Sequence, residues 1–155
     1  MAETEAAVAD LAEGYFDEGH NCAMSVLRAV AERAGLSCPA CVPGIALALG
    51  GGVGHTGHIC GALTGAAMAI GLAADRRVSG SVRAKKDEAN RLAGDLVARF
   101  AERFGAAACR SIIGFDWSEP GAIERFRREN VKAEKCVPCV RWASAEALTA
   151  VESLT

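Results

Sequence analysis

The chain has 155 residues, a net charge of −2 and seven cysteines. This length is typical of one domain with a substantial core, so we expect a single cysteine-rich domain over residues 1–155. The charge balance gives no general attraction to nucleic acid or membrane surfaces. No stretch reaches the roughly 20 apolar residues of a membrane span, and the acidic start is unlike a secretory signal. We therefore expect a cytoplasmic protein, in which so many cysteines indicate metal or redox chemistry.

Apolar residues recur at helical spacing through most of the chain. The pattern predicts helices over 4–18, 22–34 and 43–49, a central small-residue helix from Cys60 to Ala73, a polar connection from Asp75 to Ser81, a long helix from Val82 to Phe104, a short one over 107–113 and a last one from Lys135. Asn21 is a good N-cap for the second helix, and Gly19, Gly35 and Gly105 end helices. No segment reads as a strand. The sequence thus predicts an all-α bundle of about six to seven helices, with a central small-residue helix, as one domain.

Four cysteines stand at or near the start of a predicted helix or on a short helix: Cys22, Cys60, Cys109 and Cys136. A thiol in the first turn of a helix meets the positive end of the helix dipole, which stabilises its thiolate. Each of these cysteines can face the bundle interior, although a lone buried cysteine is more often a small core residue. Thiolates select zinc, copper(I) or iron–sulfur clusters. The spacings are too long for a zinc ribbon or a ferredoxin run, so the fold must assemble any such site.

A glycine-rich stretch over residues 50–57 leads into Cys60. Its spacing matches neither the dinucleotide fingerprint nor the P-loop. Glycine backbone can approach sulfur atoms closely, so Gly57 and Gly61 are candidate cofactor-binding residues. His58 joins them and ranks first among the three histidines, because it lies two residues before Cys60. Imidazole can complete a metal sphere or relay protons, although an exposed loop histidine is the commoner case.

The remaining cysteines fall into two Cys-x-x-Cys pairs, Cys38 with Cys41 and Cys136 with Cys139. Such a pair can be a redox dithiol or half of a metal site. No predicted strand precedes the first pair, unlike the arrangement in thioredoxin-like proteins. Whether Cys38, Cys41 and Cys139 are ligands, a separate dithiol or inert stays open at this point.

The hexapeptide Cys60-Gly61-Ala62-Leu63-Thr64-Gly65 resembles the Cys-Gly-Ala-x-x-Gly signature of the C_GCAxxG_C_C family of redox-active proteins. Asn21-Cys22-Ala23, the segment from Cys109 to Gly114, and Cys136 fall in the order that this family shows, so the resemblance covers roughly residues 10–150. A domain similar to this family in split-Soret cytochromes holds an iron–sulfur cluster. By that analogy the cluster ligands here are Cys22, Cys60, Cys109 and Cys136. A haem attachment is not implied, because the motif CxxCH is missing.

Our leading hypothesis is a redox protein that binds an iron–sulfur cluster of the [2Fe–2S] type and exchanges electrons with a partner protein, without being an enzyme by itself. The second hypothesis is a metal-free thiol–disulfide oxidoreductase in which Cys60 is the activated nucleophile. The third is a structural or sensing module that binds zinc. Neither nucleic acid nor a membrane is an expected partner, and a homodimer is left open.

Overall fold

The structure is a computed structural model of the chain and describes residues 1–36 and 43–154. Within these ranges the α-helices are α1 (Ala2–Asp17), α2 (Cys22–Arg33), α3 (Gly61–Arg77), α4 (Val82–Phe104), α5 (Cys109–Ile113), α6 (Ala122–Arg128) and α7 (Val137–Glu152). A 3₁₀ helix, η1 (Gly44–Leu49), precedes the glycine loop, and a π-helical turn, η2 (Lys132–Cys136), leads into α7. The described residues form no strand beyond one isolated antiparallel bridge between Ile59 and Ala108. The predicted all-α fold is therefore confirmed.

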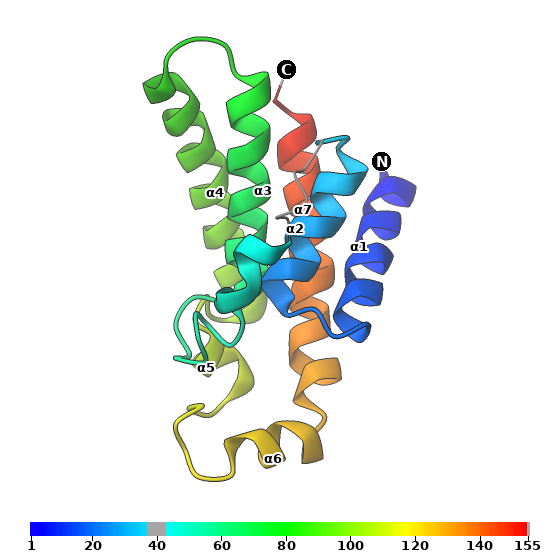
Figure 1. The fold of residues 1–155 in the computed structure, drawn as a ribbon, viewed down its shortest axis with the longest axis vertical. Helices are drawn as coiled ribbons and strands as arrows, with labels where there is room; N and C mark the ends of the chain where they lie inside the picture. The colour runs from blue at the N-terminus through cyan, green and yellow to red at the C-terminus, as the bar shows by residue number, and fades with distance from the viewer. Residues whose placement is uncertain (37–42, 155) are drawn as a thin grey trace.

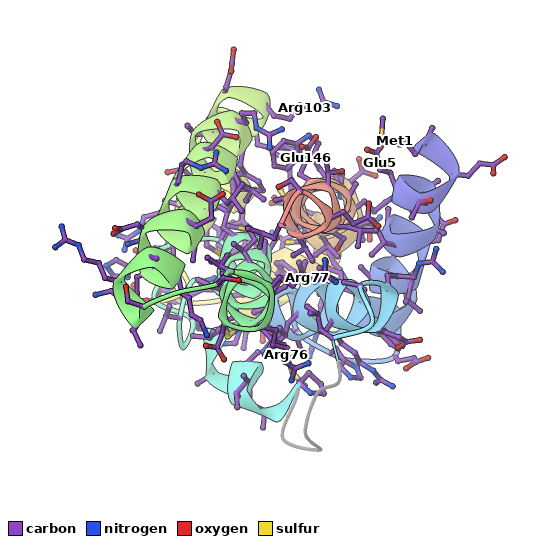
Figure 2. The ribbon with its side chains drawn as sticks, turned by 90° about the horizontal axis from the view of Figure 1, so that it is seen from above. Met1, Glu5, Arg76, Arg77, Arg103 and Glu146 are labelled. Atoms are coloured by element: carbon purple, nitrogen blue, oxygen red, sulfur yellow. The ribbon has the colours of Figure 1, made fainter. Side chains whose placement is uncertain are left out.

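Helix α7 runs through the middle of the bundle and contacts α1, α2, α3 and α4 (Figure 2). Helix α2 packs against α3, while α1 covers α2 and α4 covers α3. Both chain termini lie at one end of the bundle, and α5, α6 and the glycine loop lie at the other (Figure 1). Among the described residues, no helix combines the length and apolarity needed to cross a membrane.

Several helix boundaries follow the local signals in the sequence. The Asn21 side chain accepts a hydrogen bond from the Met24 backbone N–H at 2.9 Å and caps α2, as predicted. Ser81 caps α4 in the same way. Gly105 ends α4 in the left-handed conformation, with a φ of 80°, which a side chain would disfavour.

The end of α3 differs from the prediction. We expected the helix to stop at Ala73 and a polar connection to follow, but α3 continues to Arg77. The Arg77 guanidinium donates to the carbonyl oxygens of Val151 at 2.9 Å and Ala34 at 2.7 Å, which lie at the ends of α7 and α2 (Figure 2). Carbonyls in the last turn of a helix lack intrahelical partners, so this arginine satisfies two of them. The extra turn of α3 therefore fastens three helices together at the end of the bundle that carries the termini.

Close contact between α2 and α3 depends on Gly65. A Cβ atom built on Gly65 would overlap the carbonyl oxygen of Ala23 and lie 3.0 Å from its Cα atom. Gly71, farther along the same helix, has no heavy atom within 4 Å of the equivalent position. Gly65 thus sets the distance between the two helices, whereas Gly71 does not.

Replacing Gly65 by alanine should therefore destabilise the protein by about 1–3 kcal/mol, the usual effect of overpacking. The same change at Gly71 should stabilise it by about 0.4–1 kcal/mol, because alanine restricts the unfolded chain and favours helix. Urea unfolding of both variants beside the parent protein measures the two effects. Equal midpoints for the two variants would mean that α2 and α3 can separate freely.

Candidate functional site

A cavity of about 160 Å³ lies at the end of the bundle where α2, α3 and α7 begin. Five cysteines lie in its wall: Cys22, Cys60, Cys109, Cys136 and Cys139. Most of the other lining side chains are apolar or aromatic, and they come from α1, α5, α6 and the turn before α6: Phe16, Ile112, Ile113, Trp117 and Phe126. No Lys, Arg, Asp or Glu is among the described residues that line it. The cavity is therefore a pocket of thiols in an apolar surround.

The cysteines reach this cavity because each lies beside a helix boundary. Cys22 is the first residue of α2, and Cys60 is the N-cap of α3. Cys109 begins α5, and Cys136 closes η2 just before α7. Backbone hydrogen bonds join two of these segments, since the Cys60 N–H donates to the Ala107 carbonyl at 2.8 Å. The fold thus brings together four cysteines that the sequence singled out.

The thiols of these four cysteines affect one another's ionisation. Burial and, to a smaller extent, charge repulsion from the thiols of Cys60 and Cys109 together raise the pKa of Cys22 to about 12. The pKa of Cys136 is also raised, first by burial and then by Cys22, Cys60 and Cys109. Thiolates at these positions would repel one another, and the positive charges of Lys132 beside Cys136 and of Arg110 beside Cys109 offset this repulsion only in part.

Cys139 is a nearer neighbour of Cys60 than the sequence suggested. Both residues line the cavity and belong to the same buried cluster, and the neighbouring Cys139 thiol together with burial raises the pKa of Cys60 well above its usual value. The backbone N–H groups of Ala62 and Leu63 act in the opposite direction, as expected at a helix start, but they are outweighed. The expectation that the start of α3 stabilises a thiolate at Cys60 is therefore wrong for the metal-free protein.

Backbone N–H groups also point at Cys22. Those of Ala23 and Gly51 both lower its pKa, so the glycine loop does bring a donor to a site sulfur. Gly61 lines the cavity, and a Cβ atom built on it would overlap the Cys22 sulfur. The glycine that follows Cys60 is thus required by the close approach of two cysteine segments.

Of the histidines in the glycine loop, His55 rather than His58 lies at the cavity. The His58 side chain is exposed, and its Nδ1 lies 2.7 Å from the Thr56 hydroxyl. The His55 ring lies in the cavity wall and meets the Trp117 ring edge-on, with 4.7 Å between the ring centroids. Sequence distance from Cys60 was a poor guide here, because the loop turns repeatedly between the two histidines.

Gly57 also lies outside the cavity wall. It adopts a left-handed φ of 73°, and a Cβ atom built on it would lie 2.9 Å from the Cβ atom of Arg110. Its carbonyl oxygen accepts a hydrogen bond from the Arg110 backbone N–H at 3.0 Å. Gly57 therefore holds the loop against α5. The predicted pair Cys38 and Cys41 lies outside the described residues.

Trp117 is a site residue that the sequence did not indicate, since its segment is typical of a turn. Its indole ring lines the cavity, between His55 and Phe126. The indole N–H is buried and lacks a hydrogen-bond partner among the described residues. A tryptophan eight positions after Cys109 was the only signal in the sequence, and it is too general to assign a role.

The described ranges hold no group of three or more His, Cys, Asp or Glu side chains arranged as a ready-made site for one metal ion. The thiols instead line the wall of a cavity. Zinc requires its donors around a single ion at about 2.0–2.3 Å. An iron–sulfur cluster is held by four thiolates spread over several irons, and the cysteines of this wall are the donors it requires.

The fold and the site together define the class of this protein: it is an all-α bundle with a cysteine-lined cavity where several of its helices begin. The chain belongs to the family described as "Putative redox-active protein (C_GCAxxG_C_C)", whose model matches residues 20–150. This match confirms the resemblance read from Cys60 to Gly65 and supports a redox-active protein. No curated protein and no solved structure matches the chain.

Proposed function

We propose that this protein transfers electrons by means of an iron–sulfur cluster of the [2Fe–2S] type, bound in the cavity by Cys22, Cys60, Cys109 and Cys136. The observation that carries the proposal is that these cysteines, which are far apart in sequence, line one cavity of about 160 Å³ without lysine, arginine or carboxylate. When bound, such a cluster takes up and releases single electrons for exchange with a partner protein. The proposed ligands must be reduced cysteines. Cysteines stay reduced in the cytoplasm, so we propose that the protein is cytoplasmic.

The chain's own groups fit this role. The backbone N–H groups of Gly51 and Ala23 face Cys22, and those of Ala62 and Leu63 face Cys60. Donors of this kind hold negative charge on ligand sulfurs, and their number and direction tune a reduction potential. The apolar side chains of the wall exclude water, which strengthens each of these interactions.

A metal-free thiol–disulfide oxidoreductase is the second candidate, and the proximity of the Cys60 and Cys139 thiols in the same cavity wall favours it. Two thiols in contact can form a disulfide. However, Cys60 is only 8% exposed and Cys139 only 1%, so a protein disulfide has little access to either sulfur. The third hypothesis, a zinc module, lacks a ready-made group of donors among the described residues.

Metal and sulfide analysis of protein purified without oxygen separates the three candidates. The proposal expects brown protein with iron and acid-labile sulfide in equal amounts and visible absorption that bleaches on reduction. Colourless protein with one zinc per chain would instead establish the zinc module. Colourless protein without metal, combined with reversible oxidation of Cys60 and Cys139, would establish the dithiol enzyme.

The Cys60→Ser variant should lose the cofactor, with bound iron falling by at least about tenfold, because a hydroxyl is a poor ligand for iron–sulfur clusters. Its thermal midpoint should fall as well, since binding energy is lost. Cys38→Ser is the matched control, because Cys38 is not among the proposed ligands, and it should keep its iron. Equal iron contents in the two variants would contradict the ligand assignment.

A further inference from the structure

Trp117 carries an unsatisfied hydrogen-bond donor in the wall of the cysteine cavity. Its Nε1 is buried, and no other buried side-chain nitrogen or oxygen of the described residues lacks a partner. A buried donor without an acceptor costs roughly 1–3 kcal/mol, and folded proteins keep few of them. The indole N–H therefore requires an acceptor in or beside the cavity.

The group that this N–H approaches is the sulfur of Cys109. Trp117 and Cys109 line the same cavity, Trp117 packs against the buried cluster that contains Cys109, and the indole acts as a donor toward this sulfur. The approach falls short of full hydrogen-bond geometry. A neutral thiol is a weak acceptor, whereas a thiolate accepts strongly. The donor is thus matched to a thiolate ligand at this position.

Aromatic neighbours fix the direction of this donor. The Trp117 ring lies between Phe126, at 5.1 Å between ring centroids, and Phe115, at 5.7 Å. The His55 ring stands edge-on to it at 4.7 Å. These ring contacts restrict rotation of the indole and keep its buried N–H away from water.

We propose that Trp117 is a positioning residue that donates a hydrogen bond to the Cys109 sulfur when this sulfur is a cluster ligand, and that it thereby raises the reduction potential. The inference rests on the proposed iron–sulfur site. Reduction adds negative charge to the ligand sulfurs, so a fixed N–H donor stabilises the reduced state more than the oxidised state. Removing this donor lowers the potential without removing a ligand.

The first test is the Trp117→Phe variant, which keeps an aromatic ring and loses the N–H. Its iron and sulfide contents should match those of the parent, and its equilibrium constant for reduction should fall about tenfold, which is 59 mV for one electron. Trp142→Phe is the matched control, because Trp142 packs on Phe100 and Phe104 and does not line the cavity. That variant should keep the parent potential.

The two proposals fail in different ways. Protein that binds no iron overturns both the proposed function and this role of Trp117. Iron-loaded Trp117→Phe protein with the parent potential overturns the role of Trp117 alone.

The second test needs no bound metal and uses the indole ¹⁵N–¹H resonances of the metal-free protein. Trp117→Phe assigns the Trp117 signal by its disappearance. The Cys109→Ser variant should then shift this signal, because a hydroxyl replaces the sulfur that the N–H faces. The Trp142 signal should stay in place and serves as the internal control. A Trp117 signal that ignores Cys109→Ser would overturn the contact on which the inference depends.

Discussion

Gly61→Ala protein is expected to fold and yet to lose its cofactor. The new methyl group would overlap the Cys22 sulfur and lie 3.1 Å from the Leu49 carbonyl oxygen and 3.2 Å from the Ala23 nitrogen. The last two atoms belong to the backbone of η1 and α2, so the thiol is the group that can move. Displacing one ligand of a fitted site should reduce bound iron by about tenfold or more.

Gly71→Ala provides the control within the same helix. Its methyl group meets no heavy atom within 4 Å, so this variant should bind iron like the parent protein. Iron per chain, measured beside far-ultraviolet circular dichroism, separates loss of the site from loss of the fold. If Gly61→Ala protein binds iron as well as Gly71→Ala protein does, then Cys22 is not a ligand in the arrangement proposed here.

The bundle could be predicted from the sequence because its helices carry local signals. Helix α4 spans Val82 to Phe104 as predicted, since an apolar stripe lies between a capping Ser81 and a left-handed Gly105. The end of α3 could not be predicted in this way. Arg77 continues that helix to bond with carbonyls of Ala34 and Val151, which are distant in sequence. Such a boundary depends on tertiary contacts that no local pattern contains.

The candidate site could be predicted only in part. The family signature points to Cys60, but spacing alone cannot show that Cys109 lines the same cavity, because that depends on how the segments pack. The position of His55 rather than His58 in the cavity wall could not be predicted for a related reason. Val53 and His55 adopt left-handed φ values of 66° and 57°, and turns of this kind decide which loop side chain faces the cavity.

The cysteine cavity also lies where two hydrophobic cores meet. Cys60 and Cys139 belong to the bundle core, built by the long helices. Cys109 belongs to a small core, which we define by its buried residues: Cys109, Ile113, Phe115, Ala122 and Val131. Cys136 packs against both cores. A group bound to these thiols would therefore cross-link the small core to the bundle.

Removing the cofactor should loosen the small core more than the bundle. We expect amide hydrogen exchange across residues 109–131 to quicken by about tenfold or more, because local stability follows the apolar surface that a segment buries and the ligands that it holds. Helix α4 provides no residue of the cavity wall and should change least. Hydrogen exchange measured by mass spectrometry on loaded and metal-free protein tests this difference.

The pattern of exchange also tests the ligand assignment. Cys109 is the only proposed ligand that is buried in the small core without also contacting the bundle core. Cys109→Ser should therefore quicken amide exchange across residues 109–131 even in molecules that keep some iron on the other three cysteines. Cys60→Ser should quicken exchange in the same residues and, in addition, at the start of α3. A uniform increase in amide exchange along the whole chain in both variants would mean that the cofactor stabilises the fold globally. That result would contradict the proposal that it cross-links the two cores.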